Sequence, residues 1–86
     1  MKPKTLEHIN EIAVIGVDIG KDTFHLVGFD EAGQRILRKK IKRVALQSTF
    51  ERLPRCVVGM EACMSAHFVS RMLRALGFEP RIIPAI

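Results

Sequence analysis

The chain has too few cysteines and too short apolar runs for several common classes of protein. It holds two cysteines, Cys56 and Cys63, and no second pair that would complete a zinc site. In a reducing compartment we expect both to be small buried hydrophobic side chains rather than a disulfide. A membrane-spanning helix needs about 18 apolar residues in a row, and no run in this chain approaches that length. The first residues also lack the apolar core of a signal peptide. These absences predict a cytoplasmic protein that does not enter a membrane.

The length of the chain excludes a second domain. Its 86 residues form at most one small domain, and a composition of 48% hydrophobic and 27% charged residues is that of a globular chain. Residues 1–11 carry Pro3 and mixed charge without a clear period, so we expect them to be a loose lead-in. Residues 12–86 then form the folded domain.

The positive charge of the chain is concentrated in one segment. The formal net charge is +5, and six basic residues lie within nine positions that contain no acid. They are Arg35, Arg38, Lys39, Lys40, Lys42 and Arg43. Such a surface favours polyanions such as DNA, but a solvated edge strand has the same composition, and no aromatic residues are interleaved for base stacking. Both interpretations stay open, and Lys21 is a further candidate phosphate contact.

Hydrophobic periodicity predicts five strands and two helices. Strands are expected at 12–19, 23–29, 35–42, 56–60 and 81–83. One helix is expected from Leu46 until Pro54 ends it, and a second from the candidate N-cap Ser65 until Gly77 ends it. The order strand, strand, strand, helix, strand, helix, strand implies a mixed α/β sheet with right-handed crossovers.

Two of the apolar runs end in an acid. The run from Ile12 to Gly20 contains Asp18 and is typical of a strand buried on both faces, and the run that begins at Cys56 ends in Glu61. If the two strands pair in parallel, both carboxylates emerge at one edge of the sheet. Two carboxylates repel unless a cation lies between them, and Mg²⁺ prefers such oxygen ligands. The alternative is that each acid caps a turn or a helix, Glu61 at the helix that follows it.

Two segments resemble the N-terminal signatures of a family of bacterial insertion-sequence transposases related to the Piv-type DNA invertases. They are residues 14–25, VIGVDIGKDTFH, and residues 58–67, VGMEACMSAH. The resemblance implies a RuvC-like domain with a ribonuclease H-like fold and an Asp-Glu-Asp-Asp set of Mg²⁺ ligands for phosphodiester transfer in DNA transposition. Asp18 matches the first acid and Glu61 the second. The resemblance also implies a DNA substrate and, in full-length members, a guide RNA.

The chain departs from the family pattern in three respects. The third and fourth acids and the serine domain of the family lie further along than residue 86, and Met64 stands where the family usually has a small residue. We therefore expect the isolated chain to be catalytically inactive. We also expect one face of the sheet to lack cover, which favours self-association through that face.

Two other functions stay open. Residues 17–20, VDIG, followed by a hairpin, also resemble the first phosphate loop of actin-like ATPases and sugar kinases, although residues 60–63 have no counterpart there. The chain could also be a non-catalytic remnant that binds nucleic acid. We expect His25 and His67 to be surface side chains rather than ligands or general bases.

Overall fold

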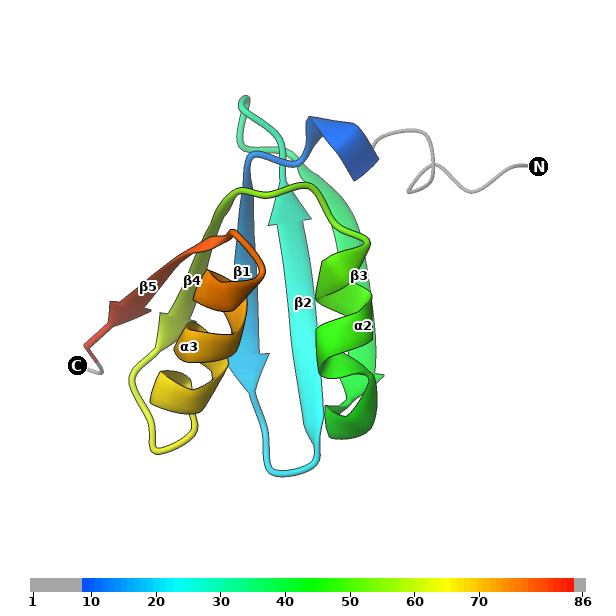
Figure 1. Ribbon diagram of the computed structural model, residues 1–86. Helices are drawn as coiled ribbons and strands as arrows, with labels where there is room; N and C mark the ends of the chain where they lie inside the picture. Colours follow the sequence, from blue (N-terminus) through cyan, green and yellow to red (C-terminus); the bar gives the residue numbers. More distant parts are fainter. Residues whose placement is uncertain (1–8, 85–86) are drawn as a thin grey trace.

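Five strands form one mixed sheet in the computed structural model, which describes residues 9–84. The strands are β1 (Val14–Ile19), β2 (Thr23–Phe29), β3 (Arg35–Lys42), β4 (Val57–Glu61) and β5 (Glu79–Ile83). Their order in the sheet is β3-β2-β1-β4-β5; β2 is antiparallel to both β1 and β3, and β4 lies parallel to both β1 and β5 (Figure 1). The predicted order of elements is confirmed, and the topology is that of a ribonuclease H-like fold.

Both α-helices lie on the same face of the sheet (Figure 1). Helix α2 (Leu46–Glu51) follows the 3-10 turn η2 (Arg43–Ala45), and helix α3 (Ala66–Ala75) connects β4 to β5. A further 3-10 turn, η1 (Ile9–Glu11), lies within the predicted lead-in, of which residues 1–8 fall outside the described residues. Between residues 9 and 84, no helix has the length and apolar character needed to cross a bilayer.

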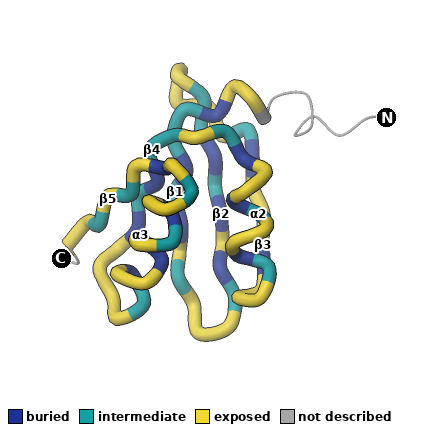
Figure 2. Tube along the Cα trace, viewed as in Figure 1, coloured by how far each residue is buried: buried dark blue, intermediate teal, exposed yellow. Residues whose placement is uncertain are grey.

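The hydrophobic core lies between the two helices and one face of the sheet. Alternate residues of the inner strands are buried there: Ile15, Val17, Phe24, Leu26, Val58 and Met60. Phe50 of α2 and Leu73 of α3 are fully buried against them, and the Phe50 ring meets the Phe78 ring edge-on at 5.3 Å between centroids. Figure 2 shows this alternation of buried and less buried positions along the strands behind the helices. Each such side chain stabilises the fold by about 1.5–3 kcal/mol.

The other side of the sheet, which carries Val14, Gly16 and Asp18 of β1, is called the open face. Val14 and Gly16 are half-buried and Asp18 is exposed, so the prediction that this strand is buried on both faces is wrong. The reason is that α2 and α3 both pack on the opposite side, and no helix or loop of residues 9–84 covers this one. The sheet lacks cover on one face, as the sequence predicts.

The two edge strands resist the addition of further strands. In β5 the N–H of Glu79 donates to the carbonyl of Cys56 at 3.0 Å, and the carbonyl of Ile83 accepts from the N–H of Ala62 at 2.8 Å. Alternate residues of β5 therefore bond inward to β4, and Pro80 stands at an outward position, where it offers no N–H. On the opposite edge β3 is rich in Lys and Arg, as predicted for an edge strand.

Arg55 ties together the carboxyl ends of both helices. Its Nε donates to the carbonyl of Leu76 at 2.7 Å, and its Nη1 donates to the carbonyls of Leu53 at 2.6 Å and Glu51 at 3.3 Å. The guanidinium also lies over the Phe78 ring, 4.9 Å from the centroid. The last carbonyls of a helix have no partner within it, and a cation there complements the helix dipole. One side chain thus serves two helix ends.

Helix α3 ends as the sequence predicts. Gly77 has φ of 97°, its N–H donates to the carbonyl of Arg74 at 3.1 Å, and the N–H of Phe78 donates to the carbonyl of Leu73 at 2.9 Å. This pair of bonds is a Schellman motif, which favours glycine at the left-handed position. Ser65 occupies the predicted N-cap position but makes no side-chain capping hydrogen bond.

The two cysteines differ in their surroundings. Both are free, Cys56 is half-buried, and Cys63 is exposed in the loop between β4 and α3. The prediction that both are buried is therefore wrong for Cys63, because the chain leaves the sheet after β4 before it enters the helix. Burial raises the pKa of the Cys56 thiol.

Replacement of Arg55 by Met is expected to lower the free energy of unfolding by about 1.5–3 kcal/mol, because helix carbonyls lose a charged donor. Urea unfolding followed by far-ultraviolet circular dichroism measures this, since the chain lacks Trp and Tyr. The matched control is Arg52→Met at an exposed position next to the end of α2, which should change the stability by about 0.5 kcal/mol or less. Equal stabilities of the two variants would show that Arg55 does not tie the helices.

The thiols are expected to react at different rates with a disulfide reagent. Cys63 should react fast and Cys56 at least about tenfold more slowly, because the reagent meets an accessible thiol at one and a half-buried thiol of raised pKa at the other. Variants Cys56→Ser and Cys63→Ser assign the two phases of the thiol reaction, and equal rates would contradict the assignment.

Above the ordinary thiol pKa of 9.0 the unfolded chain loses the Cys56 proton first, so the stability of the fold should decrease as the pH rises toward the folded-state pKa.

Candidate metal centre and nucleic-acid surface

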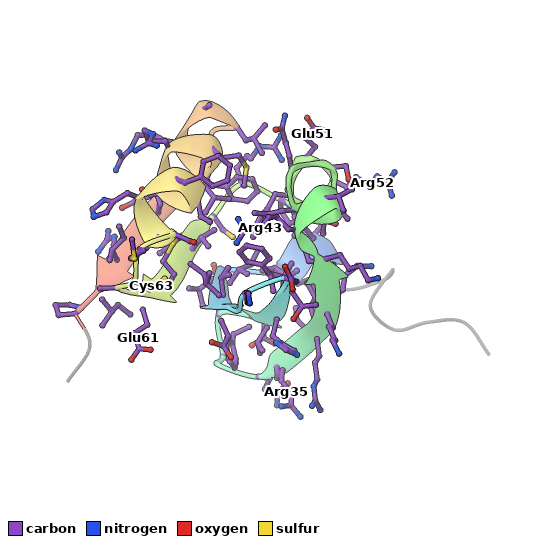
Figure 3. All side chains as sticks on the ribbon, turned by 90° about the horizontal axis from the view of Figure 1, so that it is seen from below. Arg35, Arg43, Glu51, Arg52, Glu61 and Cys63 are labelled. Carbon is purple, nitrogen blue, oxygen red and sulfur yellow. The ribbon has the colours of Figure 1, made fainter. Side chains whose placement is uncertain are left out.

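Asp18 and Glu61 lie at the carboxyl ends of neighbouring parallel strands. β1 and β4 pair in parallel with Val17 beside Met60, and Asp18 and Glu61 are the next residue of each strand. Both carboxylates are exposed, and Figure 3 shows Glu61 pointing away from the helices, on the open face. The parallel pairing on which the prediction depended is confirmed. The backbone therefore brings the two acids to the same edge of the sheet.

The two carboxylates fit part of a magnesium site. Mg²⁺ is commonly held by one or two carboxylates, with waters and substrate phosphates in the remaining positions. Across residues 9–84, no group of three or more His, Cys, Asp or Glu residues is arranged to hold a metal ion. Asp18 and Glu61 would thus leave most coordination positions to water and phosphate oxygens. The alternative that Glu61 favours the N-terminal end of α3 has little support, because its side chain points away from the helices and no capping hydrogen bond joins the two (Figure 3).

A row of charged residues crosses the open face at the level of the two acids. His25 of β2 stands directly opposite Asp18, and Lys40 of β3 stands directly opposite His25. Glu61 pairs on its other side with Ile83 of β5. Lys40 therefore occupies one end of the row, Ile83 the other, and the two acids lie between them. His25 is exposed on the strand surface, as predicted. Its position across from Asp18 depends on the register of the hairpin, and the sequence could have indicated that register only by counting residues through the turn.

An open depression of about 1250 Å³ extends over this face. Both acids and His25 line it, together with basic residues of β3: Arg35, Arg38, Lys39 and Lys40. Figure 3 shows Arg35 on the same side of the sheet as Glu61. Lys40 and Arg38 stand on the open face, level with His25 and Val27 of β2. Lys39 instead pairs with the buried Leu26 and so lies on the helix side, and Arg35 pairs with Phe29 at the end of the face away from the acids. Lys40 and Arg38 are therefore in a position to contact phosphates that approach the acids.

The other three basic candidates lie outside the depression. Lys21 is exposed in the turn between β1 and β2, and Lys42 is exposed at the end of β3. The guanidinium of Arg43 lies 5.3 Å from the centroid of the buried Phe24 ring, and its Nη2 donates to the carbonyl of Lys21 at 3.1 Å. Figure 3 places Arg43 on the helix side of the sheet. Its contacts fasten the turn that follows Asp18.

Two further residues of the second signature are on the surface. His67 is exposed on α3, as predicted, and Met64 is 99% exposed in the loop before α3. Neither lines the depression beside the acids. The bulk of Met64 therefore leaves the acid pair accessible.

Comparisons with known proteins identify transposases. No family model matches the chain. It is 36% identical over 72 residues to the transposase for insertion sequence element IS1328 of Yersinia enterocolitica. The aligned region covers 84% of this chain and 22% of that protein. It is 42% identical over 69 residues to a probable family 20 transposase of Pseudomonas aeruginosa, covering 80% and 20% of the two chains. It is 36% identical over 80 residues to the transposase for insertion sequence element IS1111A of Coxiella burnetii, and the aligned region covers 93% of this chain and 22% of that protein.

The chain spans about a fifth of the length of these curated relatives. All three are named as transposases, which favours the transposase resemblance over the ATPase alternative. The strand order and the positions of the two acids agree with the fold that the resemblance implies. The chain is therefore homologous to the N-terminal portion of the insertion-sequence transposases related to the Piv-type DNA invertases.

Proposed function

We propose that this chain is the N-terminal part of a DNA transposase that binds DNA and holds Mg²⁺ through Asp18 and Glu61 for phosphodiester transfer. The observation that carries the proposal is the position of the two acids. They stand at adjacent strand ends, exposed on the one face of the sheet that also carries the basic side chains of Arg38 and Lys40. We place this activity in the cytoplasm, where bacterial DNA lies.

The proposed roles of the residues follow from their charges. A bound Mg²⁺ would activate the attacking hydroxyl or water and stabilise the leaving oxygen. Asp18 and Glu61 would hold that cation, while Arg38 and Lys40 bind phosphates on the β3 side and fix the direction in which the nucleic acid crosses the face. The same basic surface would suit the phosphates of a guide RNA, which the family resemblance implies for full-length members.

The isolated chain is expected to bind without catalysis. The described residues supply two carboxylates at the site, where the resemblance implies four acids, and they form no cluster of three metal ligands. Nicking of supercoiled DNA by the purified chain in Mg²⁺ or Mn²⁺, abolished by Glu61→Gln, would contradict this.

Thermal unfolding in the presence of Mg²⁺ or Mn²⁺ tests the metal site. The melting temperature should rise with metal, by about 4–8 °C for each kcal/mol by which the metal at the concentration used stabilises a domain of this size. Asp18→Asn and Glu61→Gln should abolish this rise while leaving the metal-free stability equal or higher, because each removes the repulsion between the two carboxylates. Glu31→Gln, at an exposed position in the β2–β3 turn, is the matched control and should keep the full response. A metal response that survives both site substitutions would refute the assignment.

Duplex binding at several salt concentrations tests the basic surface. The double variant Arg38→Ala/Lys40→Ala should bind DNA more weakly, and its salt slope should fall by about one unit for each lost phosphate contact. The control Arg71→Ala/Arg74→Ala removes the same charge from the exposed surface of α3, on the helix side. If both double variants lose affinity equally, net charge rather than the open face accounts for the binding.

Self-association through the open face is a second proposal, which the half-buried Val14, Val27 and Phe29 favour. Because the same side would hold DNA, association and DNA binding should compete. Sedimentation of the chain at rising concentration, with and without DNA, distinguishes the two.

A further inference from the structure

The two acids stand where β1 and β4 stop pairing with each other. The paired residues of the parallel ladder end at Val17 and Met60, one residue before Asp18 and Glu61. Each acid is held instead from the strand on its other side. Glu61 is held by its pairing with β5, and Asp18 by its pairing with β2. The distance between the two carboxylates therefore depends on their outer neighbours rather than on direct pairing of β1 with β4.

The hairpin turn that follows Asp18 is tightly closed. The N–H of Gly20 donates to the carbonyl of Thr23 at 2.9 Å, so that Lys21 and Asp22 alone form its tip. A Cβ built at Gly20 would lie 2.7 Å from that same carbonyl oxygen, closer than real Cβ atoms come. The close approach of the two backbone segments therefore requires glycine at this position, and a larger residue would open the turn.

Arg43 fixes the tip of this turn to the end of β3. Its backbone N–H donates to the carbonyl of Asp22 at 3.0 Å, and its Nη2 donates to the carbonyl of Lys21 at 3.1 Å. Its guanidinium lies over the ring of the fully buried Phe24, 5.3 Å from the centroid, on the helix side of the sheet (Figure 3). Exposed loop tips are ordinarily among the less ordered parts of a domain. Here three contacts of one residue join the tip to a second strand and to the core.

We infer that Arg43 is a positioning residue that sets the distance between Asp18 and Glu61, and thereby the preference of the proposed site for Mg²⁺ over Ca²⁺. The inference rests on the proposed function and deepens it by naming a residue that determines which metal the site takes. Mg²⁺ demands near-ideal octahedral geometry with ligands at about 2.0–2.1 Å, whereas Ca²⁺ tolerates irregular geometry at about 2.3–2.6 Å. A loosened turn lets Asp18 move relative to Glu61, which weakens the binding of the smaller ion more.

The positive charge of Arg43 acts on metal binding in the opposite direction. Removal of a cation from the turn beside Asp18 should strengthen the binding of any divalent cation to the two carboxylates. Loss of positioning should instead weaken Mg²⁺ binding, and weaken it more than Ca²⁺ binding. The two effects of the guanidinium therefore differ in sign, which makes them separable by experiment.

The test measures the dissociation constants of Mg²⁺ and Ca²⁺ from the melting temperature as a function of metal concentration, at constant ionic strength. In Arg43→Met the Mg²⁺ affinity should fall about tenfold, as is usual for residues that orient metal ligands. The Ca²⁺ affinity should fall about threefold or less. Gly20→Ala opens the same turn from the other side and should change the ratio of the two affinities in the same direction. Without metal, the Gly20 amide hydrogen should exchange faster in Arg43→Met.

The matched control is Leu53→Ala, which removes a buried side chain just past the carboxyl end of α2 and leaves the turn intact. It should lower the melting temperature and keep the ratio of affinities. An unchanged ratio in both Arg43→Met and Gly20→Ala, or tighter binding of both metals by Arg43→Met, would overturn the inference and leave the metal site in place. A changed ratio in Leu53→Ala would also overturn it, because destabilisation would then account for the effect. Absence of any metal response in the unsubstituted chain would overturn the inference and the proposed metal site together.

Discussion

The parallel pairing of β1 with β4 is the constraint on which the rest of the structure depends. β3 runs parallel to β1, so the connection from β3 through α2 to β4 and the connection from β4 through α3 to β5 are both crossovers in the same direction. Because such crossovers are right-handed, the two helices must lie on the same face of the sheet. The register of the pair then places Gly16 beside Gly59, and Asp18 level with Glu61, on the opposite face. A slip of one residue in either strand would turn the two positions of that strand toward the core.

A core on one face alone makes this small domain depend on a few tertiary contacts. The helices are short, and their carboxyl ends would leave carbonyl groups without partners. Arg55, two residues before the start of β4, donates to both ends and covers the Phe78 ring, which meets the Phe50 ring at an angle of 84° in the core. The side chain that fastens the helices is therefore two residues away from the strand that positions Glu61. Stability and the geometry of the acid pair are connected through this segment.

The sequence predicts the strands and helices well, because their signals are local. The stripe of Leu46 and Phe50, and the glycine stop at Gly77, are visible within a few residues. The open face could not be predicted from periodicity, since Val14 and Ile15 are both apolar and the alternation of β1 is hidden. The role of Arg55 is equally hidden, because its partner Leu76 lies 21 residues away. The two acids were found from their positions at the ends of two apolar runs, and the resemblance supported them, whereas the row that joins Asp18 to its neighbours required the register.

Several energetically unfavourable features of the molecule lie on the open face of the sheet. Among the described residues, no ion pair neutralises Asp18 or Glu61, although Lys40 and other cations share their face. The two glycines of the inner strands and the half-buried Val14 and Val27 lie on that same face, whereas the more exposed Val44 and Phe68 lie in η2 and α3. The helix side has buried side chains, helices whose carboxyl ends are capped, and no buried side-chain polar atom without a hydrogen bond among residues 9–84. The two carboxylates without an ion pair and the two strand glycines therefore lie together on the open face, which is the face that the proposed metal site and nucleic-acid surface would use.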